Sequence, residues 1–143
     1  MECRNRDEEG RKKMQNRGKI LITDDNATNI EILEEALADK YQVVPARSGE
    51  ETLTILEEYH PDLVLLDIMM PRIDGYETCR RIRANPLLNN VKVIMVSAKA
   101  MVSERLKGYE AGADDYLTKP FDEEELLAKV RVYLRLKTVE EVD

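Results

Sequence analysis

The chain has 143 residues, of which 43% are hydrophobic and 36% charged, and its formal net charge is −7. This length fits one domain, and this composition is typical of a soluble globular protein rather than a disordered one. Residues 1–18 hold six Lys/Arg and four Asp/Glu, so the remaining 125 residues carry −9 and are not expected to bind nucleic acid directly. Because no apolar run reaches the roughly 20 residues of a membrane span and no secretory signal is present, we expect a cytoplasmic protein that does not bind membranes.

Two further features of the sequence concern its cysteines and its ends. Cys3 and Cys79 belong to no CxxC pair and have no histidine nearby, so neither a disulfide nor a zinc site is expected. Residues 1–18 lack hydrophobic periodicity, which predicts a flexible N-terminal arm. The folded domain is expected over residues 19–138, followed at 139–143 by a helix extension or the start of a linker.

From Lys19 onward, short apolar runs alternate with amphipathic segments. The apolar runs predict five strands, at residues 19–24, 41–46, 62–67, 91–98 and 114–120. The amphipathic segments predict five helices, at residues 26–40, 48–59, about 75–84, 102–111 and 122–137. This alternation predicts βαβ units, and hence an α/β fold with a single doubly wound parallel sheet of five strands covered by five helices.

Local signals refine these boundaries. Thr28 and Glu31 have the spacing of a capping box for the first helix, and Ser48 and Glu51 have the same spacing at the start of the second. Pro45 lacks a backbone donor, which favours an edge position for the strand at 41–46.

Polar residues terminate most of the predicted strands. Asp24 and Asp25 follow the first strand, Asp67 follows the third, Ser97 ends the fourth and Lys119 follows the fifth. In an open parallel sheet these strand ends share one edge, where α/β proteins bind their ligands. Three adjacent carboxylates need a cation, and a set of oxygen ligands without His or Cys favours Mg²⁺ or Mn²⁺. Because Mg²⁺ in such sites often binds phosphate oxygens too, the pattern predicts a site for a phosphoryl group.

The motifs at these strand ends resemble a known family. The segments LITDDN, LVLLDIMMPRIDG, VIMVSA and GADDYLTKPF are similar, in order and spacing, to the receiver domain of bacterial two-component response regulators, over about 120 of the 143 residues. The resemblance implies the flavodoxin-like strand order 2-1-3-4-5 that the family shares.

The resemblance also implies roles for individual residues. Asp67 matches the phosphoacceptor, Asp25 a direct metal ligand, and Asp24 an acid that acts on the metal mainly through water. The backbone carbonyl of Met69 matches the third protein ligand of the metal, and Lys119 matches the lysine that neutralises phosphoryl oxygens.

Two further positions match the switch of the family, Ser97 as the hydroxyl residue and Tyr116 as the aromatic that turns inward on phosphorylation. Met69 and Lys99 occupy the positions that set the hydrolysis rate, and neither is suited to hold an attacking water, which predicts a long-lived phosphoryl group. Thr23 departs from the pattern, because the family commonly has an aliphatic residue there.

The function implied is phosphorelay signalling, in which the protein is not an enzyme but assists its own phosphorylation and dephosphorylation. The implied donor is a sensor histidine kinase or a phosphotransfer protein, and the implied receiver of the signal is a downstream output domain or protein. The face made by the helix at 102–111, the strand at 114–117 and the last helix is expected to be the surface that partners read, and it is a candidate surface for a homodimer.

Two alternatives lie in other classes. A phosphatase with an aspartate nucleophile is disfavoured, because its nucleophile follows the first strand and its general acid stands two residues later, where Met69 follows Asp67 here. A degenerate receiver that acts as an unphosphorylated interaction module stays open until phosphorylation is measured.

The last predicted helix carries two apolar stripes. One stripe, expected to cover the sheet, consists of Leu126, Leu127, Val130 and Leu134. The other consists of Val132, Leu136, Val139 and Val142. The second stripe fits either a frayed helix end or a helix that continues toward a partner subunit or an output domain, as a coiled-coil seam does.

Overall fold

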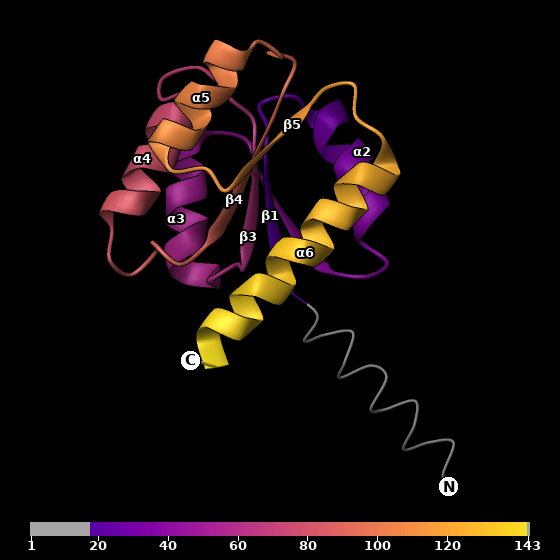
Figure 1. Cartoon of the computed structure of the whole chain (residues 1–143), viewed down its shortest axis with the longest axis vertical. Coiled ribbons are helices and arrows are strands. Elements are labelled where there is room, and N and C mark those ends of the chain that lie inside the picture. The colour runs from indigo at the N-terminus through magenta and orange to yellow at the C-terminus, as the bar shows by residue number, and fades with distance from the viewer. Residues whose placement is uncertain (1–17, 143) are drawn as a thin grey trace, which may run out of the picture.

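The computed structural model describes residues 18–142, with side chains for residues 18–136, and contains a parallel five-stranded sheet between two layers of helices (Figure 1). The strands are β1 (Lys19–Thr23), β2 (Gln42–Ala46), β3 (Leu63–Leu66), β4 (Lys92–Ser97) and β5 (Asp115–Thr118). The helices are α2 (Ala27–Leu37), α3 (Gly49–Tyr59), α4 (Gly75–Ala84), α5 (Val102–Ala111) and α6 (Glu123–Val142). The strand order is β2-β1-β3-β4-β5, so the predicted fold and order are confirmed.

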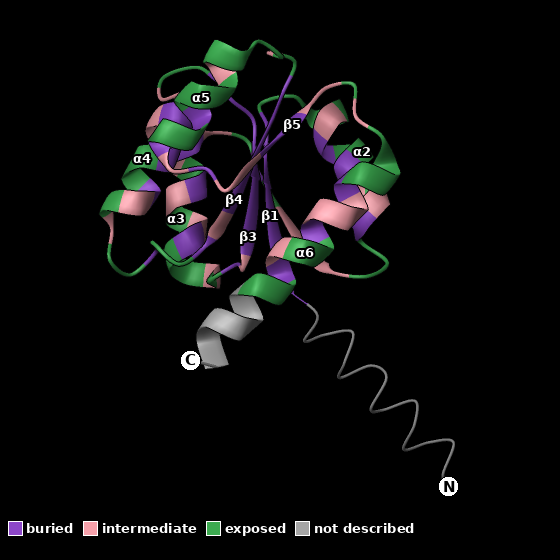
Figure 2. Ribbon diagram, viewed as in Figure 1, coloured by how far each residue is buried: buried purple, intermediate pink, exposed green. Residues whose placement is uncertain are grey.

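Each face of the sheet builds its own core because side chains alternate along a strand. Leu21 and Val64 point to the face covered by α3, α4 and α5, whereas Ile20, Ile22 and Leu65 point to the face covered by α2 and α6. Figure 2 shows the strands buried between these layers, with exposed residues on the outer sides of the helices. The continuous apolar runs of β3 and β4 therefore belong to strands covered on both faces, as predicted.

The start of α2 differs from the prediction. Asn26, rather than Thr28, caps the helix, and its side-chain oxygen accepts hydrogen bonds from the backbone N–H groups of Thr28 (2.8 Å) and Asn29 (3.2 Å). The predicted capping box of Thr28 and Glu31 is wrong, because the Asn26 N–H also donates to the Asp24 carboxylate (2.9 Å) and this turn starts the helix earlier.

The start of α3 agrees with the prediction. Ser48 caps the helix, and its hydroxyl accepts a hydrogen bond from the Glu51 N–H at 3.0 Å. The Glu51 carboxylate accepts a hydrogen bond from the backbone N–H of Arg47 (3.2 Å), whereas a capping box would use the N–H of Ser48, one residue later. Pro45 lies in the edge strand β2, also as predicted.

Cys79 and α6 complete the account of the fold. Cys79 is buried in α4, and burial raises the pKa of its thiol to about 11, which leaves it unreactive.

Leu126, Val130 and Leu134 of α6 are buried against the sheet, while Leu136 is exposed. The helix runs to Val142, but the side chains of residues 137–143, like the predicted arm at 1–17, lie outside the described residues. Within residues 18–142, no helix combines the length and hydropathy that a bilayer crossing requires.

Candidate functional site at the carboxyl edge of the sheet

Three carboxylates meet where β1 and β3 end. Asp24, Asp25 and Asp67 each place one oxygen within 4.8 Å of the others. Asp24 is 2% exposed and Asp67 is 8% exposed, whereas Asp25 faces solvent. The cluster therefore has a buried inner part and an open mouth.

The register of the sheet explains this meeting. β1 and β3 are adjacent parallel strands in which Thr23 pairs with Leu66, so the residues that follow each strand emerge side by side. The N–H of Asp67 donates to the Thr23 carbonyl (2.9 Å), and the N–H of Asp24 donates to the Ala46 carbonyl of β2 (3.1 Å). Backbone hydrogen bonds between neighbouring strands thus set the positions of both residues.

Lys119 supplies a positively charged ammonium group to the cluster from the edge of the sheet formed by β5. It follows β5, and its ammonium lies 3.0 Å from the Asp24 carboxylate and 3.9 Å from that of Asp67. The backbone N–H of Lys119 donates to the Ser97 carbonyl (2.8 Å), and a cis peptide bond joins Lys119 to Pro120. The lysine is therefore shared between two acids, and it is closer to Asp24.

The electrostatics of Asp67 show that one lysine does not balance the cluster. Burial and the nearby charge of Asp24 raise the pKa of Asp67 to about 6, although Lys119 and the backbone N–H groups of Met69 and Ile68 oppose the shift. A hard divalent cation with oxygen ligands fits this donor set, because it would remove the remaining repulsion. The donor set and charge of the site therefore fit the expected divalent cation.

The loop after Asp67 is packed tightly against the start of α4. The N–H groups of Met70 and Gly75 both donate to the Ile68 carbonyl, at 3.1 and 2.9 Å. A Cβ on Gly75 would lie 2.4 Å from the Asp67 carbonyl oxygen, so only glycine fits there. The Met69 side chain is 60% exposed, beside a cavity of about 350 Å³ that Asp25 and Lys99 also line.

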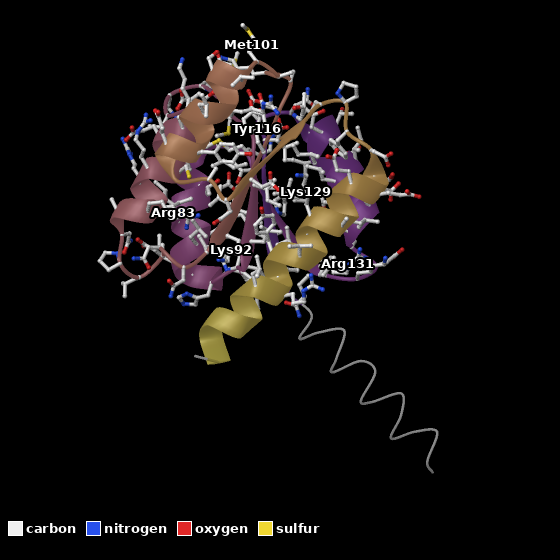
Figure 3. The ribbon with its side chains drawn as sticks, in the orientation of Figure 1. Arg83, Lys92, Met101, Tyr116, Lys129 and Arg131 are labelled. Carbon is white, nitrogen blue, oxygen red and sulfur yellow. The ribbon has the colours of Figure 1, made fainter. Side chains whose placement is uncertain are left out.

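Ser97 and Tyr116 form a second group on β4 and β5. Ser97 is fully buried, and its hydroxyl accepts the N–H of Lys99 (3.3 Å). The Tyr116 hydroxyl donates to the Lys99 carbonyl (2.7 Å), and the ring is 6% exposed on the side of the sheet covered by α4 and α5 (Figure 3). The sequence predicts that Tyr116 turns inward on phosphorylation, whereas its ring is inward already in this structure.

Several supporting residues escaped the sequence analysis. Arg47 donates through Nε (3.3 Å) and Nη2 (2.9 Å) to the backbone carbonyl of Asp25, which ties the loop after β2 to the acidic pair. The hydroxyl of Thr23 lies 2.7 Å from that of Thr52 of α3. The unusual polar residue at position 23 was a signal for the second contact, but no pattern in the sequence marks Arg47, because its partner is a backbone atom.

Comparisons with known proteins agree with this arrangement. A family model described as "Response regulator receiver domain" matches residues 20–131. The chain is 46% identical over 121 residues to "Probable transcriptional regulator ycf27" of Cyanophora paradoxa and 44% identical over 121 residues to "Response regulator MprA" of Mycolicibacterium vanbaalenii. These matches cover 84% of this chain in both cases, but 49% and 52% of the relatives, so the chain spans about half the length of the curated relatives it matches.

A solved structure gives the same result in three dimensions. The crystal structure of a CheY-like response regulator receiver domain protein from Methanospirillum hungatei superposes with a TM-score of 0.79 at 30% identity, covering 85% of this chain and 97% of that one. The match of the family model over most of the chain, together with this fold, identifies the family. The chain belongs to the response regulator receiver domains of two-component signalling.

Proposed function

We propose that Asp67 accepts a phosphoryl group and that this modification switches the surface that partners read. The observation that supports the proposal best is the crowding of Asp24, Asp25 and Lys119 around a nearly buried Asp67. A carboxylate in this position is a nucleophile beside groups that handle phosphoryl charge.

A divalent cation, Mg²⁺ or Mn²⁺, belongs to this proposal. Asp25, Asp67 and the backbone carbonyl of Met69 would hold it, with Asp24 acting mainly through a bound water. The set fits such an ion because every donor is an oxygen and the three carboxylates otherwise repel one another. When bound, the ion would neutralise charge on the phosphoryl oxygens.

The transfer itself is a substitution at phosphorus. An Asp67 carboxylate oxygen attacks the phosphorus of a phosphohistidine on a sensor kinase or phosphotransfer protein. The new O–P bond forms as the N–P bond breaks, and the imidazole leaves with that electron pair. Lys119, 3.9 Å from Asp67, supplies positive charge where the phosphoryl oxygens would lie. Hydrolysis of the acyl phosphate would be slow, because the neighbouring Met69 side chain is apolar.

The signal would leave the site through Ser97 and Tyr116. The buried Ser97 hydroxyl is a rotatable donor at the end of β4, and turning it toward phosphoryl oxygens would release the Lys99 N–H that it now accepts. Because Tyr116 donates to the carbonyl of the same residue, this change would alter the loop that holds the aromatic ring.

We also propose the face of α5, β5 and α6 as the surface read by partners or by a second copy. Its exposed apolar side chains are Met101, Val102, Leu106, Tyr109, Val132 and Leu136. Exposed apolar residues gathered on one face are typical of interaction surfaces. Relatives described as transcriptional regulators suggest that the response reaches an output domain that binds DNA, whereas this acidic domain would not bind DNA directly.

Intact-mass measurement tests the chemistry. Incubation with Mg²⁺ and a small acyl phosphate should add one phosphoryl group to the wild-type chain and none to Asp67→Asn, since an amide is a poor nucleophile. Asp39→Asn, a change at an exposed acid outside the cluster, should react like wild type. Asp25→Ala should weaken Mg²⁺ binding and slow the reaction. Labelling that persists in Asp67→Asn would place the acceptor elsewhere, and an unlabelled wild-type chain would favour the unphosphorylated interaction module.

A further inference from the structure

The first turn of α5 carries a carboxylate that contacts two other parts of the structure. Glu104 accepts a hydrogen bond from the Tyr76 hydroxyl of α4 at 2.8 Å, and it lies 3.6 Å from the Lys99 ammonium in the loop before α5. We call these three residues the Glu104 bridge. Met101 at the start of α5 makes no side-chain cap, so the bridge supplies side-chain contacts at a helix end that lacks a cap.

Tyr76 and Glu104 are the more shielded members of the bridge, whereas the Lys99 side chain is 36% exposed. The Tyr76 residue is 8% exposed and the Glu104 side chain 20% exposed. Burial and the Glu104 hydrogen bond raise the pKa of Tyr76 well above its usual range, so its hydroxyl stays protonated and donates. The same hydrogen bond, followed by the charge of Lys99, lowers the pKa of Glu104 and keeps it an acceptor. Both partners thus hold their hydrogen-bonding roles across the physiological pH range.

Lys99 links the bridge to the two switch residues. Its side chain pairs with Glu104, while its N–H donates to the Ser97 hydroxyl and its carbonyl accepts the Tyr116 hydroxyl (2.7 Å). Any movement of Lys99 therefore changes the carbonyl that accepts the hydrogen bond of the Tyr116 hydroxyl.

Tyr76 links the bridge to the phosphoacceptor loop. The preceding residue, Gly75, donates its N–H to the Ile68 carbonyl and packs its Cα against the Asp67 carbonyl so closely that a Cβ would not fit. The start of α4 therefore moves together with the loop after Asp67. The hydrogen bond of the Tyr76 hydroxyl to Glu104 couples this movement to α5. This route is separate from the path along β4 through Ser97.

We propose that Tyr76 and Glu104 are positioning residues of the switch. Through Lys99 they hold the loop at 98–101 in the position in which the Lys99 carbonyl accepts the Tyr116 hydroxyl. They also couple the phosphoacceptor loop to α5 through α4. The proposal rests on the proposed function for its signalling role. Its structural part, the control of loop 98–101 and of Tyr116 by the bridge, does not depend on phosphorylation. Losing a hydrogen bond to a charged group should loosen the loop by about tenfold in its opening equilibrium.

Amide hydrogen exchange followed by NMR tests the structural part in the unphosphorylated chain. Tyr76→Phe keeps the ring but removes the hydroxyl, which donates to both the carboxylate (2.8 Å) and the backbone carbonyl (3.1 Å) of Glu104. Glu104→Ala removes the carboxylate, which pairs with both Tyr76 and Lys99, and leaves the backbone carbonyl in place. Each should speed exchange at residues 98–104 by about tenfold and shift the Tyr116 ring resonances. The matched controls Tyr109→Phe and Glu110→Ala change the same residue types on exposed positions of α5 and should leave this exchange as in wild type.

The double variant and the phosphorylated state complete the test. Because both changes remove the same contact between the Tyr76 hydroxyl and the Glu104 carboxylate, the effect of the double variant on exchange should be smaller than the sum of the two single effects. With Mg²⁺ and acyl phosphate, Tyr76→Phe should still gain one phosphoryl group on Asp67, yet α5 should show smaller amide shifts than in wild type. Wild-type exchange in both single variants, additive effects in the double variant, or a full α5 response in Tyr76→Phe would overturn the proposal. A wild-type chain that takes no phosphoryl group would overturn the proposed function, while the exchange results would still decide the bridge.

Discussion

At the β1–β3 end of the carboxyl edge, three carboxylates meet and one lysine contacts two of them. At the β4–β5 end, the buried hydroxyls of Ser97 and Tyr116 both have hydrogen-bond partners in Lys99. In the first region, burial and then the nearby charge of Asp24 raise the pKa of Asp67, so its carboxylate is unfavourably placed when charged. The second is satisfied in its present arrangement. A bound cation or phosphoryl group would therefore relieve more unfavourable electrostatic energy at the first region than at the second. The second region has one defined conformation that can be exchanged for another.

The largest effect is expected where the first region meets α4. Gly75→Ala would place a methyl group 2.4 Å from the backbone oxygen of Asp67, and backbone cannot move aside cheaply. We expect unfolding free energy to fall by more than about 3 kcal/mol. In Gly108→Ala the new methyl would meet the flexible end of Met95 at 2.9 Å, and helix propensity would offset part of the cost. Denaturant titration of both variants measures the difference, and equal losses would show that the Asp67 loop is not rigid.

Removal of the buried charge of Asp67 should make the protein more stable. Asp67 has its folded-state pKa raised from 3.8 to about 6, so its favourable contribution to stability is present below pH 3.8 and is lost as pH rises through 6. Without divalent ions at pH 7.5, Asp67→Asn should therefore gain up to about 3 kcal/mol over wild type, and the gain should vanish near pH 4. Unfolding midpoints measured in chelator between pH 4 and 8 check this, and a gain independent of pH would exclude charge as its cause.

A smaller loss should follow removal of the shared cation. Lys119→Met leaves Asp24, which is 2% exposed, beside a like charge, and should cost about 2 kcal/mol in chelator. Lys129→Met removes a lysine of similar exposure, 25% against 22% for Lys119, whose ammonium lies 2.8 Å from Asp115, outside the acidic cluster. Added Mg²⁺ should recover stability in Lys119→Met beyond its effect on Lys129→Met. Equal recovery in calorimetry would mean that the ion binds away from the cluster.

The smallest effect concerns the hydroxyls beneath the acidic pair. Thr52 donates to the Ser48 carbonyl (2.8 Å) and therefore accepts from Thr23 (2.7 Å). Thr23→Val should lower the unfolding free energy by about 1 kcal/mol, because one hydrogen bond is lost. Mg²⁺ affinity should be unchanged, since no charge is involved. A marked fall in affinity, measured by calorimetry, would assign Thr23 to the metal site.

The sequence by itself determined the alternation of strands and helices, because burial on both faces of a parallel sheet demands continuous apolar runs such as 63–66 and 93–96. It also indicated which polar residues end the strands, since Asp24, Asp25, Asp67, Ser97 and Lys119 each interrupt or follow an apolar run. Residue roles came from the resemblance to receiver domains, not from pattern alone.

Only the tertiary structure decided which partners these residues have. The Arg47 contact with a backbone carbonyl and the contact of Tyr76 with Glu104 join residues 22 and 28 positions apart, a separation that no helical or strand period indicates. The inward position of Tyr116 depends on a carbonyl 17 residues away, offered by a loop that the bridge holds. Periodicity reports which side of an element is buried, whereas hydrogen-bond partners depend on how separate elements approach one another, and that is set by packing of the whole domain.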